Sequence, residues 1–136
     1  MPMRQKSLDA SKTFDRPVEL IFIDGLHEYE SVKSDFEAWF PKLVTDGKII
    51  FHDSVLMPGV KRLVSEVVRS GRVNNIGFVH SSTYATKTER ATSLDRARNV
   101  FILALKRGYA LSTKIYIPPM LKKALGYAGR MMFNRP

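Results

Sequence analysis

The chain has 136 residues, a length that suits one domain with a modest core. Its apolar share of 44% and charged share of 26% are those of a globular protein, and no apolar run reaches the ~20 residues that cross a bilayer. It contains no cysteine, which excludes disulfides and thiolate chemistry. The polar N-terminal stretch lacks the apolar centre of a signal peptide, so we expect a cytoplasmic protein.

The net charge of +9 is concentrated toward the C-terminus. Basic and acidic side chains balance up to Asp95, and after Asp95 the chain has nine Lys or Arg residues and no acid. We therefore predict a basic tail at residues 108–136, partly helical over 120–133. A solvated tail, weak contact with an anionic membrane surface, and docking onto the domain or a second copy are all compatible with this pattern. Aromatic residues do not alternate with the charges, so no nucleic-acid partner is expected.

The first half of the chain predicts alternating strands and helices. Residues 18–23 form an apolar run that only Glu19 interrupts, which is typical of a parallel strand buried on both faces. Apolar residues then recur at helical spacing as far as Leu43, and residues 45–47 carry a turn signal. The expected elements are a short helix at 7–14, a strand at 18–23, a helix from 29 or 30 to 43 and a strand at 48–51.

The second half predicts one more helix and two more strands. Pro58 suits the first turn of a helix with an apolar stripe, and Gly71 ends that helix. Four threonines in a polar stretch favour a long loop before the next apolar run. We expect a strand at 75–80, a loop at 81–97 and a strand at 98–105, with the two strands paired as an antiparallel hairpin at the edge of the sheet.

This order of elements, β-α-β-α-β-β, predicts an α/β fold whose first two strands are parallel. A doubly wound domain normally begins with a strand and a Gly-rich turn, but the sequence contains no G-x-G. The strand at 18–23 would also leave an open apolar edge. We therefore expect residues 1–107 to be the C-terminal half of a domain, the last four strands of a partial doubly wound sheet. Either a longer chain or another chain would supply the rest.

Acidic and histidine side chains follow both parallel strands directly. Asp24 and His27 come after the first strand, and His52 and Asp53 come after the second. Because parallel strands in a βαβ unit point their carboxyl ends at the same edge, we expect these four residues to converge. Ligands bind at that edge in open α/β sheets, so the sequence predicts a functional site there.

Three motifs carry a resemblance to a known family: FIDGxHxYxxVxxD at residues 22–35, DGKIIFHD at 46–53 and PGV at 58–60. Over about residues 5–107 the chain resembles class I S-adenosylmethionine-dependent methyltransferases. The nearest branch holds sugar O-methyltransferases and cephalosporin-hydroxylase-like proteins. The resemblance implies a Rossmann-like sheet and is most specific between Phe22 and Val60.

The resemblance also implies metal-assisted transfer of a methyl group from S-adenosylmethionine to a hydroxyl of a sugar or polyketide-like small molecule. Asp24, His52 and Asp53 would bind Mg²⁺, and His27 would be the catalytic base beside the catalytic Asp24. His52 stands where relatives carry Asp, Glu or His, and imidazole is a poorer ligand for Mg²⁺ than carboxylate. The cofactor-binding residues implied are Asp24, Gly25 and Tyr29.

Methyl transfer to a hydroxyl is also reasonable from the chemistry of these residues alone. A divalent cation lowers the pKa of a hydroxyl, and a histidine can take its proton. Two alternatives from other classes stay open. The missing Gly-rich half favours a non-catalytic remnant or a binding module completed by a partner, and a homo-oligomer would fit that. His27, His52 and one Asp could instead form an iron site for oxidation or hydrolysis.

Overall fold

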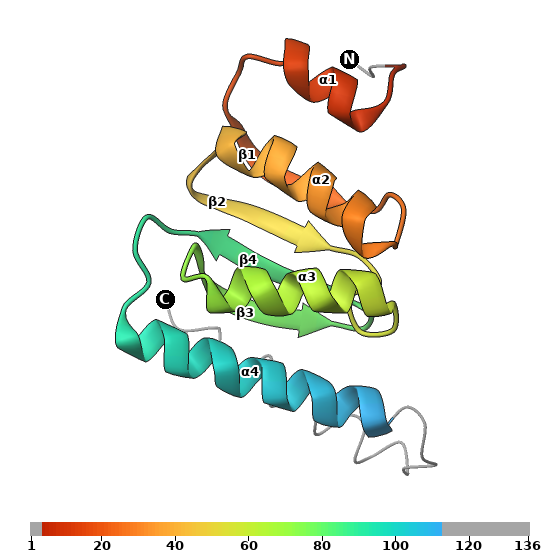
Figure 1. The fold of residues 1–136 in the computed structure, drawn as a ribbon. Coiled ribbons are helices and arrows are strands. Elements are labelled where there is room, and N and C mark those ends of the chain that lie inside the picture. Colours follow the sequence, from red (N-terminus) through yellow and green to blue (C-terminus); the bar gives the residue numbers. More distant parts are fainter. Residues whose placement is uncertain (1–3, 113–136) are drawn as a thin grey trace.

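The computed structural model describes residues 4–112 as four α-helices, one 3-10 helix and four strands (Figure 1). The predicted helix at 120–133 lies outside the described residues. The elements are α1 (Ser7–Thr13), β1 (Val18–Ile23), α2 (Tyr29–Trp39), η1 (Phe40–Lys42), β2 (Leu43–Phe51), α3 (Pro58–Arg69), β3 (Val73–Val79), β4 (Ser82–Lys87) and α4 (Ser93–Ser112).

The four strands form one mixed sheet in the order β1-β2-β4-β3. β1 and β2 are parallel, with Ile23 opposite Phe51 at their carboxyl ends, and the other two pairings are antiparallel. The α/β class, a four-stranded sheet and an antiparallel hairpin at one edge are therefore confirmed, although the second strand of that hairpin is not the one predicted at 98–105. The parallel pairing brings the residues that follow β1 and β2 to the same edge of the sheet.

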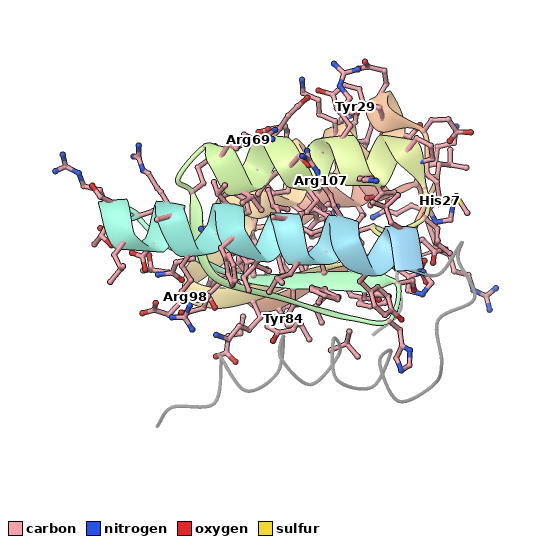
Figure 2. All side chains as sticks on the ribbon, turned by 90° about the horizontal axis from the view of Figure 1, so that it is seen from below. His27, Tyr29, Arg69, Tyr84, Arg98 and Arg107 are labelled. Carbon is pink, nitrogen blue, oxygen red and sulfur yellow. The ribbon has the colours of Figure 1, made fainter. Side chains whose placement is uncertain are left out.

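The core lies between the sheet and the helices. α2 and α3 pack side by side over the sheet, and α4 packs against α3 and β3 (Figures 1 and 2). The apolar stripe predicted for α3 is confirmed, because Val60, Leu63, Val64 and Val67 are all buried. The largest fully buried side chains come from most of these elements and include Phe36, Phe51, Leu43, Ile49, Leu63, Ile76 and Ile102.

The prediction for residues 81–105 was wrong. The expected loop contains β4, and the expected strand at 98–105 is the middle of α4. Buried positions in α4 recur at helical spacing, at Asn99, Ile102, Leu103 and Lys106, whereas Phe101 is exposed. The hairpin partner of β3 is therefore β4, and His80, predicted to lie in a strand, is the turn residue with φ 51°.

The end of the second helix was also predicted wrongly. α2 stops at Trp39 and a 3-10 turn follows, because Pro41 has no N–H with which to continue the helix. Leu43 then begins β2 and pairs with Val18. The expected turn around Asp46 is a positive-φ irregularity inside that strand, where the register with β1 shifts.

β1 is buried on one face only, although its apolar run predicted burial on both. Ile21 and Ile23 point into the core, whereas Leu20 is 58% exposed and Phe22 is 54% exposed. α2 packs against β1, and among residues 4–112 no helix buries Leu20 and Phe22. α4 also runs without a break through residues 107 and 108, where the sequence predicts the start of the tail.

Candidate functional site

Asp24 and His52 meet at the carboxyl ends of β1 and β2. The backbone N–H of His52 donates to the carbonyl of Ile23 at 3.0 Å, which extends the parallel pairing by one residue. This bond sets the two side chains beside each other, and Nδ1 of His52 lies 2.8 Å from Oδ1 of Asp24. Both side chains are about half-exposed, so a ligand can reach them.

Asp53 turns its carboxylate toward the same point. Its backbone has φ 48°, an uncommon conformation for a residue other than glycine, and its carbonyl accepts the N–H groups of Leu56 and Met57. These bonds hold the turn that leads into α3. Oδ2 of Asp53 lies 3.5 Å from Nδ1 of His52 and 3.6 Å from Nε2 of His27. A positive-φ residue beside clustered ionisable groups is a common mark of a functional site.

His27 is held by the close approach of α3 to the loop after β1. A Cβ at Gly59 would collide with the backbone of His27 and Tyr29, so only glycine allows this contact. The PGV motif therefore has a structural role, which is to seat α3 against the loop that carries His27. Figure 2 shows His27 at the end of the molecule where the C-terminal end of α4 also lies.

Two nitrogen atoms in this cluster have no hydrogen-bond partner among residues 4–112, although both lie near carboxylates. Nε2 of His27 and Nδ1 of His52 are buried as atoms, yet neither makes a hydrogen bond to the described residues. Ligand atoms of Asp24, His27 and His52 all lie within 4.8 Å of one another. Polar atoms that are buried without a partner are rare, and a bound ion or substrate is one way to satisfy them.

The residues predicted to contact a cofactor lie in two different settings. Gly25 borders the cluster, where a Cβ would come within 3.2 Å of the Asp35 carboxylate. Tyr29 instead donates its hydroxyl to Glu66 at 2.7 Å, which lowers the pKa of the Glu66 carboxyl. The guanidinium of Arg62 lies 3.7 Å from the centre of the Tyr29 ring and covers one face of it.

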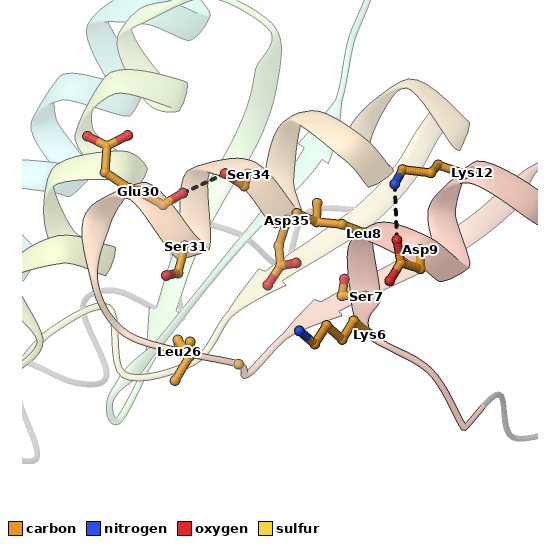
Figure 3. Close-up of a pocket in the computed structure, with 11 residues that line it drawn as sticks. Lys6, Ser7, Leu8, Asp9, Lys12, Leu26, Glu30, Ser31, Ser34 and Asp35 are labelled. Carbon is orange, nitrogen blue, oxygen red and sulfur yellow. Dashed lines mark hydrogen bonds and ion pairs between the residues drawn. The ribbon is translucent and has the colours of Figure 1, made fainter.

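An open groove borders the cluster between α1 and the N-terminal half of α2 (Figure 3). It has a volume of about 730 Å³ and is lined by Leu8, Gly25, Leu26 and Asp35, among others. A second groove of about 510 Å³ runs along β1 as far as Asp24. Ligand pockets in proteins have volumes in this range.

A buried network behind the site was missed by the sequence analysis. Lys106 of α4 is only 4% exposed and donates to Oγ1 of Thr83 at 2.6 Å. Thr83 lies 2.7 Å from Oγ of Ser54, the residue next to Asp53. Burial, followed by the nearby charge of Lys61, lowers the pKa of Lys106 to about 7. The signal that could have revealed α4 is Thr92-Ser-Leu-Asp95, a capping box in which each end residue bonds the backbone of the other.

Residues 2–54 match a family model described as a methyltransferase domain. The matched segment contains β1, α2 and all four clustered residues. The resemblance seen in the sequence is thereby confirmed over this segment of the chain.

Two curated relatives share parts of the chain. The uncharacterized protein y4gI of Sinorhizobium fredii is 48% identical over 40 residues, which are 29% of this chain and 4% of that protein. The uncharacterized protein R132 of Acanthamoeba polyphaga mimivirus is 26% identical over 88 residues, which are 60% of this chain and 39% of that protein. The chain therefore spans less than half the length of either relative.

Two solved structures resemble the chain weakly. Both are MycE, a methyltransferase of the mycinamycin biosynthetic pathway, one with Mg, SAH and mycinamycin VI and the other with Mg and SAH. They share 14% sequence identity and cover 60% of this chain and 28% of theirs, with TM-scores of 0.46 and 0.45. Among the described residues, no helix has both the length and the apolarity to cross a membrane.

Proposed function

We propose that this chain takes part in S-adenosylmethionine-dependent methyl transfer to a hydroxyl of a small molecule, of the sugar or polyketide-like class. The observation that carries the proposal is the convergence of two carboxylates and two imidazoles at the carboxyl ends of two parallel strands. The match of residues 2–54 to a methyltransferase domain supports it. This edge of an open α/β sheet is where ligands bind.

S-adenosylmethionine supplies a methyl group on a positively charged sulfur. In our proposal Asp24 and Gly25 border the bound cofactor, because both line the groove along β1. The exposed carboxylate of Asp24 offers a hydrogen-bond acceptor and a negative charge there. Tyr29 would contact the cofactor only by the ring face that Arg62 leaves open.

His27 is the proposed base. Transfer of the methyl group from sulfur to the acceptor oxygen would release the hydroxyl proton, and Nε2 of His27 would accept it. Nε2 is suited to this because it makes no hydrogen bond to the described residues. The Asp53 carboxylate, 3.6 Å away, then faces the positively charged imidazolium.

A divalent cation fits this cluster in part. Asp24 and Asp53 offer the hard oxygen ligands that such cations take, and both carboxylates approach Nδ1 of His52. A cation there would lower the pKa of an acceptor hydroxyl. The imidazole of His52 does not match the all-oxygen preference of Mg²⁺.

A second candidate function is a binding module that a partner strand completes. It is favoured by the position of β1 at the edge of the sheet, with Leu20 and Phe22 more than half exposed. Sedimentation of the chain tests this candidate. A well-packed monomer would contradict any need for a partner strand.

Isothermal titration of the full chain with S-adenosylmethionine tests the methyltransferase proposal. We expect saturable binding that Asp24→Asn weakens by about tenfold, the loss of one charge-assisted contact. His80→Asn is the matched control, because His80 lies in the β3–β4 turn with a positive φ that asparagine tolerates. If millimolar cofactor gives no binding heat, the proposal is wrong.

A further inference from the structure

We infer that the cation of this site is one that accepts an imidazole nitrogen, of the Zn²⁺, Co²⁺ or Mn²⁺ class, and not Mg²⁺. His52 is the ligand that makes this selection, through Nδ1. The inference rests on the proposed function, since it names the cofactor class of that site. It does not depend on methyl transfer, because the ion can be bound and measured without S-adenosylmethionine.

The spacing of the atoms around His52 suits neighbouring ligands of one ion. Two ligands at about 2.1 Å from a metal lie about 3.0 Å apart at a right angle and about 3.4 Å apart at a tetrahedral angle. Nδ1 of His52 lies 2.8 Å from Oδ1 of Asp24 and 3.5 Å from Oδ2 of Asp53. Each carboxylate is therefore placed to bind a cation together with Nδ1 of His52.

The burial of Nδ1 of His52 and its lack of a hydrogen bond also favour coordination of a cation by this atom. Nδ1 is buried and makes no hydrogen bond to any residue in 4–112, although two carboxylates lie within reach of it. A buried polar atom without a hydrogen-bond partner is unfavourable. The backbone of His52 is fixed by its bond to Ile23, so the imidazole is held beside Asp24 before any ion arrives. Coordination would satisfy the nitrogen at little conformational cost.

The combination of carboxylate and imidazole ligands favours Zn²⁺, Co²⁺ or Mn²⁺ over Mg²⁺. Mg²⁺ takes oxygen ligands in near-octahedral geometry and gives up water reluctantly, so one imidazole among three protein ligands is a poor match. Zn²⁺, Co²⁺ and Mn²⁺ accept imidazole and carboxylate together. Because most mixed sites favour Co²⁺ over Mg²⁺ to some degree, the informative quantity is how much that preference depends on His52.

The experiment measures Kd for Co²⁺ and for Mg²⁺ by isothermal titration, with each metal alone. We expect the wild-type chain to bind Co²⁺ more tightly. His52→Asp should lower the ratio of Mg²⁺ to Co²⁺ dissociation constants by about 10- to 100-fold, because it replaces nitrogen with a carboxylate oxygen. His80→Asn removes a histidine outside the cluster and should leave the ratio unchanged.

If His52→Asp fails to fold, His52→Asn takes its place in the titrations. A spectroscopic measurement provides a second test of the inference. With Co²⁺ bound, proton NMR should show a strongly shifted exchangeable imidazole N–H that is absent from the His52 variant. An unchanged ratio of dissociation constants, or no shifted imidazole signal, overturns the inference. Intact Co²⁺ selection in a chain that does not bind S-adenosylmethionine would overturn only the proposed methyltransferase function.

Discussion

Two polar clusters meet at the end of β2, and they contrast in how their atoms are satisfied. The site cluster (Asp24, His27, His52 and Asp53) is partly exposed, and within residues 4–112 one nitrogen atom of each histidine has no hydrogen-bond partner. The inner cluster consists of Ser54, Thr83 and Lys106, which are all buried, and their hydroxyls and amine are hydrogen-bonded to one another. The polar groups of the inner cluster are partnered within the fold, whereas the site cluster leaves two nitrogen atoms that a bound ion or substrate would satisfy.

The hydrogen bonds of the inner cluster run in one direction. The single proton of the Ser54 hydroxyl goes to the carbonyl of Ser81, so Thr83 must donate to Ser54. Lys106 in turn donates to Thr83. This chain ties α4 and the β3–β4 hairpin to the residue after Asp53, and we infer that it is structural.

The largest expected effect comes from the burial of Lys106, whose pKa is lowered from the usual 10.5 to about 7. Between these values the unfolded chain binds one more proton than the folded chain, so the free energy of unfolding rises with pH. We expect a slope of about 1.4 kcal/mol per pH unit, or about 3 kcal/mol from pH 7.5 to 9.5. Urea titrations at several pH values measure it.

Lys106→Met should remove this slope, because methionine has no proton to lose. Lys61→Met should move the rise to higher pH, since the charge of Lys61 contributes to the lowered pKa of Lys106. An equally steep slope in the Lys106→Met chain would mean that another group titrates in this range, and the contrast between the two clusters would lose its main support.

The next largest effect is expected for Thr83→Val. The change keeps the side-chain shape but removes the acceptor of Lys106 and the donor to Ser54, so two buried groups lose a partner. We expect the free energy of unfolding to fall by about 1–3 kcal/mol. Thr83→Ser keeps both bonds and removes one methyl group, so its loss should be about 0.8 kcal/mol. Similar losses in both variants would mean that packing, and not hydrogen bonding, stabilises this region.

Much of the site was predictable because its signals are local. The apolar run of β1 and the stripe of α3 specify their elements, and two parallel strands joined by one helix must end at the same edge. The convergence of Asp24, His27, His52 and Asp53 follows from that rule and is confirmed. The roles of these residues stay predictions, because no ligand marks which atoms bind and which react.

The inner cluster was not predictable for a physical reason. Ser54, Thr83 and Lys106 lie on three elements, and polar side chains are usually taken as surface residues. Val100 and Phe101 beside Ile102 made α4 look like a strand, although its buried positions follow a period of three to four residues. The burial of Lys106 depends on how α4 packs on α3 and β3, which no local pattern encodes.

The smallest effect on stability is expected at the site itself, with His52→Phe. Phenylalanine removes the nitrogen and keeps an aromatic ring beside Phe22, whose ring centre lies 6.1 Å from that of His52. We expect the free energy of unfolding to change by no more than about 0.5 kcal/mol, or to rise, while Co²⁺ binding is lost. Urea titration and isothermal titration of the same preparation measure the two quantities.

Such a result would distinguish the site cluster from the inner cluster. A partly exposed histidine whose loss leaves the free energy of unfolding unchanged contributes to binding and not to folding. A loss of more than about 1 kcal/mol would instead place His52 with Thr83, as a side chain that the fold itself needs. In that case its two carboxylate neighbours would hold the imidazole as a structural ion pair, and the cation would have to be bound by the remaining oxygens of Asp24 and Asp53.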